Sequence, residues 1–334
     1  MPLFPHTPDA AFVSALDIAD VPPGTLKKYY LQLVTDGMAT PIYLPVVVVR
    51  GIDDGPVVGM TAAVHGNELN GIPVIQQVVR SLDPQRLRGT VVGVPGVNLP
   101  SLLRRQRRFP DGTDLNHIMP GRPDGTVSEV YAHRFVERVV RRFDYLFDLH
   151  TASFGRVNSY YIRADMADER VRDMVEHQGA QIVVHNPPGD GTLRGAVADM
   201  GIPAITLEVG NPNTFQRDMI RQSVQGILNY LVTLGMHGEE LATMKYETVY
   251  CERSYWLYAD TGGLLTVTPR ITQRLAAGER IAELRNPFGD FVRAYDAPED
   301  GIVIGHSVNP VCQTGGRLIH LGVVRAAGAP ASAA

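Results

Sequence analysis

Residues 57–71, VVGMTAAVHGNELNG, decide the fold because they join two different sequence patterns. The apolar run 57–64 is typical of a buried strand, and the spacing of apolar residues over 69–82 predicts a helix. His65 and Glu68 lie three residues apart at this strand-to-helix turn. The pair fits a metal site, but it also fits two polar residues at a surface turn. Whether the pair is a metal site therefore depends on which other residues lie close to it.

The same alternation of strands and helices continues through most of the chain. Further apolar runs predict strands at 28–35, 43–50, 90–94, 145–149, 158–162, 181–184 and 202–207. Helical periodicity recurs at 128–142, 166–178 and 215–234. Strands that alternate with helices indicate an α/β fold, in which helices cover both faces of a sheet. We expect this domain to span residues 1–243.

Beyond residue 243 the pattern changes to short alternating runs separated by Gly, Pro and Asp. No helix of useful length fits there, so residues 244–325 are predicted to form a small all-β domain. The segment resembles the half-barrels of lipoyl and biotinyl carriers, but its candidate hairpin turn at 285–290 lacks the lysine that carriers modify. The expected role is instead a lid, a substrate gate or an oligomer contact. The Pro/Ala-rich tail 326–334 is predicted to be disordered.

The composition is that of an ordinary globular chain and argues against several classes of protein. The 334 residues are 44% apolar and 20% charged, and the net charge of −4 argues against general nucleic-acid binding. No apolar run reaches the roughly 18 residues of a membrane span, and the first residues show no signal-peptide pattern. Cys251 and Cys312 are far apart and in no CxxC motif, which suits a reducing compartment. We expect a cytoplasmic protein.

Polar residues follow two further predicted strands in the same way. Asp148 and His150 end the strand at 145–149, and Glu208 ends the strand at 202–207. Ligands of α/β proteins bind at the carboxyl ends of the strands. Standing alone, Glu208 would be a solvent-facing turn residue, and Asp148 fits either a support behind a metal ligand or an ordinary strand end. It is less expected that three predicted strand ends would together supply the residues of a zinc hydrolase by chance.

Four motifs, in this order, resemble the succinylglutamate desuccinylase/aspartoacylase family, which is related to the zinc carboxypeptidases. They are His65-Gly-Asn-Glu68, Asp114-Leu-Asn116 followed by Met-Pro-Gly, Asp148-Leu-His150-Thr, and Glu208 within LEVGNP. The resemblance covers roughly residues 40–320. It implies a mixed sheet flanked by helices, as in the zinc carboxypeptidases, followed by the small C-terminal all-β domain.

The resemblance also implies a zinc site with a base beside it. His65, Glu68 and His150 are the implied ligands of one Zn²⁺ per chain, which leaves a coordination position for water. Glu208 is expected to take the proton of that water and to pass it to the leaving amine. Asp148, two residues before His150, is expected to support that ligand from behind.

Further implied positions surround the substrate. Arg108 corresponds to the family arginine that helps to polarise the scissile carbonyl, and Asn98 and Asn116 correspond to positions near the substrate. The family has an arginine after its Asp-Leu-Asn motif, where a bidentate fork binds the substrate carboxylate, but this chain has His117. The carboxylate clamp is therefore altered, or another arginine replaces it. Arg194, on a short predicted helix before the last catalytic strand, is the candidate replacement.

Together these features favour a zinc-dependent amidohydrolase that removes the acyl group from an N-acyl amino acid or a similar small compound. Two alternatives stay open: a carboxypeptidase that acts on a peptide or an isopeptide-linked acidic residue, and a non-catalytic zinc-binding protein on the same fold. The expected partner is a small-molecule N-acyl amino acid or a short peptide, with no nucleic acid and no membrane. The sequence leaves open the acyl group, the amine and assembly into a homo-oligomer.

Overall fold

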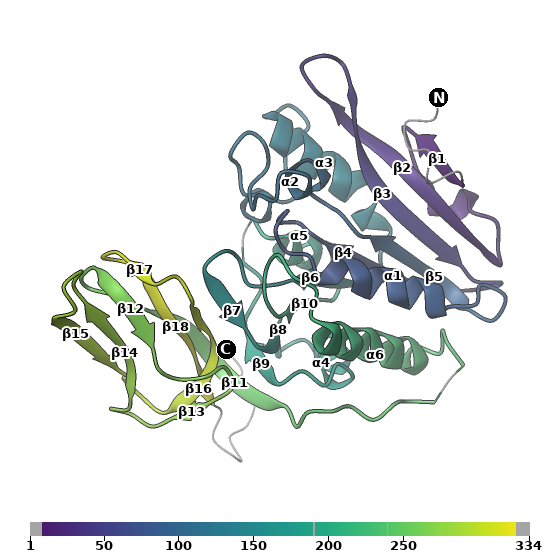
Figure 1. Ribbon diagram of the computed structural model, residues 1–334. Helices are drawn as coiled ribbons and strands as arrows, with labels where there is room; N and C mark the ends of the chain where they lie inside the picture. Colours follow the sequence, from purple (N-terminus) through teal and green to yellow (C-terminus); the bar gives the residue numbers. More distant parts are fainter. Residues whose placement is uncertain (1–8, 190, 239, 325–334) are drawn as a thin grey trace.

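The computed structural model describes residues 9–189, 191–238 and 240–324, so the predicted disorder of 326–334 lies outside the described residues. Up to residue 238, strands and helices alternate along much of the chain (Figure 1). The strands there are β1 (Ala10–Val13), β2 (Thr25–Thr35), β3 (Pro41–Arg50), β4 (Asp53–Ala62), β5 (Arg88–Val94), β6 (Tyr145–His150), β7 (Arg156–Asn158), β8 (Tyr160–Ala164), β9 (Ile182–His185) and β10 (Ala204–Val209). The helices are α1 (Gly71–Ser81), α2 (Leu99–Leu102), α3 (Val127–Arg138), α4 (Glu169–Glu176), α5 (Leu193–Ala198) and α6 (Arg217–Thr233).

These strands belong to one large mixed sheet. Its 14 strands run in the order β1-β2-β3-β5-β4-β6-β10-β8-β9-β11-β18-β16-β13, with β7 paired to β16 outside this path. The central strands β5, β4, β6 and β10 are parallel to their neighbours within that group, whereas β3 and β8 join it in antiparallel fashion. The structure therefore confirms the predicted α/β fold with a mixed sheet.

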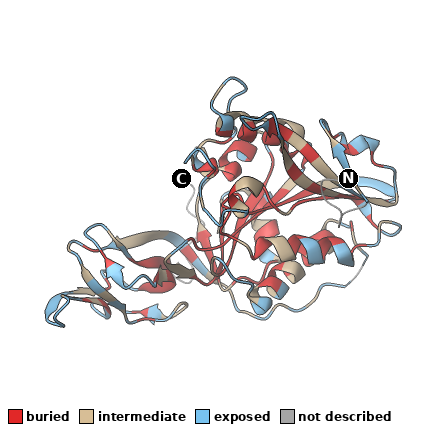
Figure 2. Cartoon of the chain, turned by 45° about the horizontal axis from the view of Figure 1, so that its top comes forward, coloured by how far each residue is buried: buried red, intermediate tan, exposed pale blue. Residues whose placement is uncertain are grey.

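Helices cover both faces of this sheet, and alternate strand residues feed a separate core on each face. Val48 and Val92 belong to the core that contains α3 and α5, whereas their chain neighbours Val49 and Val91 belong to the core that contains α1, α4 and α6. Figure 2 shows the central strands as largely buried. A strand buried on both faces is apolar at nearly every position, which explains the continuous apolar runs in the sequence.

The C-terminal domain is all-β, as predicted, and it continues the large sheet. Its strands are β11 (Val249–Tyr258), β12 (Gly263–Val267), β13 (Arg274–Leu275), β14 (Arg280–Arg285), β15 (Phe291–Asp296), β16 (Gly301–Ser307), β17 (Val311–Cys312) and β18 (Arg317–Val324). β11 pairs in parallel with β9, and β16 pairs antiparallel with β7. A second sheet, β15-β14-β12-β17, completes the domain around its own apolar core. The predicted boundary near residue 243 stays a prediction.

Two details differ from the elements expected from the sequence. The helix predicted at 128–142 ends at Arg138, because Val139 leaves helical geometry (φ −123°, ψ −60°), and a short 3₁₀ turn, Val140–Arg142, follows. The short strands β1 and β7 and the short helix α2 were not predicted. In the described part of the chain, no helix is both long enough and apolar enough to cross a membrane.

Candidate active site

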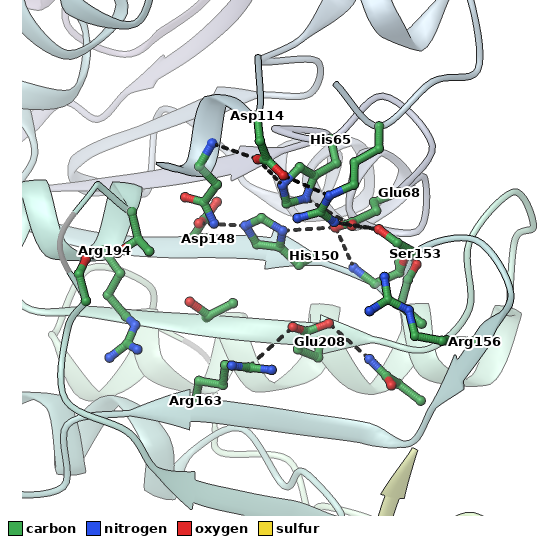
Figure 3. Close-up of a pocket in the computed structure, with 18 of the residues that line it drawn as sticks. His65, Glu68, Asp114, Asp148, His150, Ser153, Arg156, Arg163, Arg194 and Glu208 are labelled. Atoms are coloured by element: carbon green, nitrogen blue, oxygen red, sulfur yellow. Dashed lines mark hydrogen bonds and ion pairs between the residues drawn. The ribbon is translucent and has the colours of Figure 1, made fainter. Parts of the chain in front are cut away.

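Three neighbouring parallel strands, β4, β6 and β10, end at the same edge of the sheet. Glu208 on β10 pairs in register with His150 on β6, and Thr61 on β4 pairs with Asp148 on β6. The hydroxyl of Thr61 donates a hydrogen bond of 2.7 Å to Asp148 Oδ1. The strand ends singled out from the sequence therefore lie side by side, and Figure 3 shows their side chains around one cavity.

The turn after β4 directs His65 and Glu68 toward this edge. Ala63 has a φ of 55°, in the left-handed region, and so bends the chain away from the strand direction. Gly66 lies so close to the α2 segment that a Cβ atom would stand 2.3 Å from the carbonyl carbon of Ser101, so only glycine fits. The N–H of Glu68 donates to the carbonyl of His65 at 3.1 Å and closes the turn.

Both histidines turn Nδ1 toward Glu68 and Nε2 toward an aspartate (Figure 3). His65 Nδ1 is 3.0 Å from Glu68 Oε1, and His150 Nδ1 is 2.9 Å from Glu68 Oε2. On the other side of the rings, His65 Nε2 is 3.0 Å from Asp114 Oδ1, and His150 Nε2 is 2.8 Å from Asp148 Oδ2. An aspartate that accepts a hydrogen bond from Nε2–H fixes the ring and leaves the lone pair of Nδ1 for a metal ion, which is the usual support of metal-ligating histidines.

The group formed by His65, Glu68 and His150 can hold a metal ion. Its candidate ligand atoms lie within 4.8 Å of one another, and all three residues are buried. His65 Nδ1 is buried and makes no hydrogen bond to any described residue, because its contact with Glu68 is short but lacks hydrogen-bond geometry. A buried nitrogen without a hydrogen bond is costly, and a coordinated cation would satisfy it. Two imidazoles and one carboxylate also leave a coordination position open.

The charges around this group favour a cation at its centre. Burial by itself would lower the pKa of His150, but Asp148 and Glu68 outweigh it and hold that pKa well above its ordinary value. Burial likewise opposes charging of His65, yet Glu68 and Asp114 raise its pKa. Burial would raise the pKa of Glu68, but the two histidines hold it well below its ordinary value. Three carboxylates therefore lie against two imidazoles, and this excess of negative charge favours a bound cation.

Glu208 faces this group from the adjacent strand and is itself buried. Asn158 Nδ2 donates to Glu208 Oε2 at 3.2 Å, and Arg163 Nε lies 3.6 Å from Oε1. Burial raises the pKa of Glu208, and the nearby Arg163 and His150 only partly oppose this. A carboxylate whose pKa is shifted toward neutrality is suited to accept a proton and to return it.

Arg107, rather than its neighbour Arg108, reaches the centre of the site. Arg107 Nη1 donates to Glu68 Oε1 at 3.0 Å, and its Nε donates to Asp114 Oδ2 at 2.9 Å. Arg108 is an exposed residue of the cavity lining, and its Nη1 donates to the carbonyl of Gly112 at 3.2 Å. The carbonyl-polarising role of Arg108 stays a prediction. Sequence reasoning missed Arg107 because no periodicity fixes the direction of adjacent side chains in an irregular loop.

Asn116 and His117 line the cavity, whereas Asn98 does not. Asn98 is fully buried, caps α2, and donates from Nδ2 to the carbonyl of Val64 at 3.2 Å. Its side chain therefore stabilises the fold and does not face the cavity. Asn116 Oδ1 accepts from the N–H of Leu193 at 2.8 Å and thereby fixes the start of α5. His117 is exposed.

Arg194 lies at one end of the cavity and has no carboxylate partner among the described residues. The residue is only 6% exposed. Its Nη1 donates to the carbonyl of Asn186 at 2.6 Å, and its Nη2 donates to Asn186 Oδ1 at 2.5 Å. Burial, followed by the nearby Arg163, lowers the pKa of Arg194 to about 10, so the guanidinium is still charged at neutral pH. A buried cation without a counter-ion leaves its charge available to an anionic ligand.

The cavity has a volume of about 560 Å³. The C-terminal domain forms part of its other side. Trp256 of β11 and Arg317 of β18 line it together with Arg156 of β7. The guanidinium carbon of Arg317 lies 5.1 Å, and that of Arg156 5.9 Å, from the centre of the Trp256 ring. Sequence reasoning missed this wall, for which the one available signal was that Trp256 is the only tryptophan of the chain.

Comparison with known families matches the first part of the chain to one of them. The model of the succinylglutamate desuccinylase/aspartoacylase catalytic domain matches residues 54–234. The match spans more than half of the chain and includes all four motifs described above. It ends before the strands that carry Trp256 and Arg317.

Two curated relatives are named as enzymes that remove an acyl group. The chain is 26% identical over 272 residues to the N-alpha-acetyl-L-2,4-diaminobutyric acid deacetylase of Halomonas elongata, with 78% of this chain and 76% of that protein covered. It is 28% identical over 183 residues to the succinylglutamate desuccinylase of Pseudomonas paraeruginosa. This second match covers 49% of this chain and 53% of the relative, or about half of each.

Solved structures share the fold over nearly the whole chain. The product-bound ectoine utilization protein EutE (DoeB) of Ruegeria pomeroyi superposes with a TM-score of 0.82 at 21% identity, covering 91% of this chain and 98% of that one. A succinylglutamate desuccinylase/aspartoacylase of Rhodobacter sphaeroides gives a TM-score of 0.81 at 24% identity, covering 92% and 98%. These structures include the C-terminal domain in the shared fold. With its catalytic segment matched from β4 to α6, the chain belongs to the succinylglutamate desuccinylase/aspartoacylase family.

Proposed function

We propose that this protein is a zinc-dependent deacylase that hydrolyses the amide bond of an N-acyl amino acid. The observation that carries this proposal is the buried group of His65, Glu68 and His150, with Glu208 facing it from the next strand. The relative from Halomonas elongata is named as a deacetylase of an acetylated amino acid, which supports the same substrate class.

His65, Glu68 and His150 would hold the zinc ion, because two imidazole nitrogens and one carboxylate are a common protein ligand set of catalytic zinc. The chemistry supplied by bound zinc is Lewis-acid activation of a water molecule and of the scissile carbonyl. Asp148 and Asp114 keep the Nε2 protons of the two histidines in place, so that both Nδ1 atoms face inward. The chain thus presents its donors already oriented.

Glu208 moves the proton. It accepts a proton from the attacking water at one of its carboxylate oxygens and returns it to the nitrogen of the leaving amine. Asn158 donates to Oε2 and Arg163 lies near Oε1, so the carboxylate is held in one orientation from both sides. Burial raises its pKa, which keeps the protonated form accessible during the reaction.

Arg194 binds the carboxylate of the amino-acid part of the substrate. It is buried, charged and without a carboxylate partner in the described chain, so an incoming carboxylate gains a charge-assisted bond at little further desolvation cost. His117, at the position where the family has an arginine, is exposed and contributes no bidentate fork. Arg194 therefore replaces the clamp that His117 does not provide.

Metal analysis and a substrate screen test this proposal together. The purified protein should hold one zinc per chain, and a chelator should remove zinc and activity together, with both restored by added zinc. The screen contains N-acetyl and N-succinyl amino acids and short acidic peptides, and the amine should be released from the N-acyl amino acids. Cleavage of the peptides alone would favour a carboxypeptidase. Bound zinc without hydrolysis of any amide would favour a binding protein.

The ligand assignment has its own test. His150→Ala should lose bound zinc and activity together, because it removes one of three ligand atoms. The thermal unfolding of the variant shows whether the fold is kept. A folded His150→Ala protein with wild-type zinc affinity would contradict the assignment.

A further inference from the structure

We propose that Asn158 is a positioning residue that orients Glu208, and that the C-terminal domain holds Asn158 in place through Gly305. The inference rests on the proposed function, because it takes Glu208 as the group that moves the proton. It goes beyond that function by giving the C-terminal domain a part in the reaction, although the family match ends at residue 234. This part differs from the lid, substrate gate or oligomer contact expected from the sequence.

Asn158 is buried beside the carboxylate of Glu208. Its side chain lines the cavity, and the residue is only 5% exposed. Asn158 Nδ2 donates to Glu208 Oε2 at 3.2 Å, and Arg163 lies on the other side of the carboxylate (Figure 3). The main-chain N–H of Asn158 donates to Asn211 Oδ1 at 3.2 Å, and Asn211 follows the strand that carries Glu208. Both the backbone and the side chain of Asn158 are therefore bonded to the end of β10.

The strand that carries Asn158 is held by the C-terminal domain. β7 lies outside the path of the large sheet and pairs with β16, which belongs to that domain (Figure 1). Asn158 is opposite Gly305 in this pairing. Just after β7, both the N–H and the hydroxyl of Ser159 donate to the carbonyl of Ile304 at 2.9 Å. The position of Asn158 relative to Glu208 therefore depends on β16.

Gly305 is a glycine because of the space around it. Its φ lies outside the left-handed region, so the backbone conformation does not require a glycine. A Cβ atom here would stand 2.3 Å from Asn158 Oδ1 and 2.5 Å from the carbonyl oxygen of Val157. The register of β16 with β18 also shifts between Val303 and Gly305, and such irregularities are common beside active sites, where they redirect a strand. Any larger residue at position 305 would displace Asn158.

This close approach decides which end of the Asn158 amide faces Glu208. Asn158 Oδ1 is buried and makes no hydrogen bond to a described residue, which is unfavourable for a carbonyl oxygen. Gly305 packs against this oxygen. The opposite end of the amide, Nδ2, is its only donor, and a carboxylate can only accept when it is ionised. The amide is therefore held with its donor toward Glu208.

The orientation of Glu208 matters for the chemical step more than for substrate binding. Glu208 has to reach first the proton of the water and then the nitrogen of the leaving amine. A catalytic group that is misplaced by about 1 Å can lower the rate roughly 10²-fold. The bond from Asn158 fixes one oxygen of the carboxylate and so limits its rotation. Loss of this bond is expected to lower kcat and to leave KM nearly unchanged.

Kinetics of Asn158 variants test the positioning role. Asn158→Ala should lower kcat roughly 10–100-fold, the scale of one hydrogen bond to a charged group. Zinc content should not change, because Asn158 is outside the group of candidate ligands. Asn158→Asp keeps the size of the side chain but lacks the donor, so kcat should fall at least as far. A wild-type kcat in either variant, or a loss that appears in KM alone, would overturn the proposal.

Ser159→Ala is the matched control for these variants. It removes a side-chain hydrogen bond between the same two segments, but Ser159 does not line the cavity. The main-chain N–H of Ser159 still donates to the carbonyl of Ile304, so the strand pairing is kept. This variant should lose some thermal stability and retain the wild-type kcat. A loss of kcat as large as that of Asn158→Ala would mean that the strand pairing, and not the Asn158 side chain, matters.

Gly305→Ala tests the link to the C-terminal domain. The added methyl group displaces Asn158, so kcat should fall. The double variant Asn158→Ala/Gly305→Ala should have the kcat of Asn158→Ala alone, because both changes act through one contact with Glu208. Losses of kcat that multiply would show two independent effects and contradict the link.

A second variant covers the case in which Gly305→Ala does not fold. Asn158→Gln keeps the amide but adds a methylene group to a side chain that already packs against Gly305. The donor can then no longer sit at its place beside Glu208, and kcat should fall. An Asn158→Gln protein with the wild-type kcat would show that Gly305 does not confine the amide.

A crystal structure of Asn158→Ala separates this inference from the proposed function. The side chain of Glu208 should adopt another rotamer or several, while the three candidate zinc ligands stay in place. This result needs no hydrolysis, so it would support the positioning of Glu208 even if the wild type cleaved no amide and the deacylase failed. An unchanged orientation of Glu208 in an active enzyme would refute the positioning role and leave the deacylase intact.

Discussion

His150, which lines the cavity, and His320, which packs behind Trp256 on the opposite side, are buried to the same degree and surrounded by opposite charges. His150 is 4% exposed and His320 is 3% exposed. Asp148 and Glu68 raise the pKa of His150 well above its ordinary value against the effect of burial. Burial, with Arg163 and Arg317 nearby, holds the pKa of His320 well below that value. Burial is common to both, so the partners decide the sign.

This contrast divides the cavity into two kinds of site. Carboxylates gather around the histidines at the ends of β4 and β6, where they favour a bound cation. Arginines gather on the side formed by β7, β11 and β18, where they favour a bound anion. His320 stacks on Trp256 at 5.1 Å between ring centres and stays neutral, so it supports the aromatic surface without adding charge. Glu208 lies between the two kinds of site.

The largest expected effect is at Glu208. Glu208→Gln keeps the size of the side chain but cannot accept a proton, so kcat should fall by roughly 10²–10⁴-fold. Zinc content should stay at the wild-type level, because Glu208 is outside the group of candidate ligands. Metal analysis and steady-state kinetics on the same preparation check both points. A variant with normal kcat would remove Glu208 from the mechanism.

The acidic side can be weakened without removing a ligand. Asp148→Asn replaces the carboxylate that holds His150 Nε2, and zinc affinity should fall roughly 10–100-fold. Competition with a chelator measures this affinity. Asp199→Asn is the matched control, since Asp199 is exposed and outside the cavity lining. If both variants bind zinc as the wild type does, Asp148 has no supporting role.

A smaller effect is expected at Arg194, which supplies positive charge to the other end of the cavity. Arg194→Ala should raise KM for N-acyl amino acids by about tenfold for each 1.4 kcal/mol of binding free energy lost, with a smaller change in kcat. Arg194→Lys should recover part of the affinity, because it keeps the charge but not the fork. Steady-state kinetics with one acidic and one neutral substrate measure this. If His117→Arg changes the acidic-to-neutral preference and Arg194→Ala does not, the clamp lies at position 117.

The smallest expected effect concerns the pH dependence of stability. His320 is neutral in the folded protein, whereas in the unfolded chain it takes up a proton below a pKa of about 6.5. Below that pH the unfolded state binds more protons, so this histidine lowers the free energy of unfolding as pH falls, by at most about 1.4 kcal/mol per pH unit. His320→Gln should lose less stability between neutral and mildly acidic pH than the wild type does. Denaturant unfolding at several pH values compares the two, and identical slopes would contradict the charge contrast.

The side of the cavity that contains the histidines and carboxylates could be predicted from the sequence, whereas the arginine side could not. His65, Glu68, His150 and Glu208 each lie at or just after a strand end, and strand ends are visible locally as the limit of an apolar run. The family motifs then identified these residues as one set. The predicted strands β2 to β6 and β8 to β10 are present for the same reason, since burial on both faces leaves a continuous apolar pattern.

The arginine side depends on contacts that no local pattern encodes. Arg156, Trp256 and Arg317 come from three strands whose pairing is a property of the complete sheet. The irregular loop before Asp114 decides that Arg107 rather than Arg108 turns inward. Asn98 has a residue type suited to substrate binding, but its side chain caps a helix. In each case the chemistry of the side chain could be predicted from the sequence, but its direction could not.

The parallel pairing of β9 with β11 has a consequence for the integrity of the molecule. Without the C-terminal domain, β9 would be the last strand of the large sheet, with a row of unpaired backbone N–H and C=O groups facing solvent. Such open edges invite pairing with other chains and lead to aggregation. The domain that contributes Trp256 and Arg317 to the cavity is therefore also the cover of this edge. A chain shortened to the family-matched segment is expected to self-associate rather than persist as a minimal enzyme.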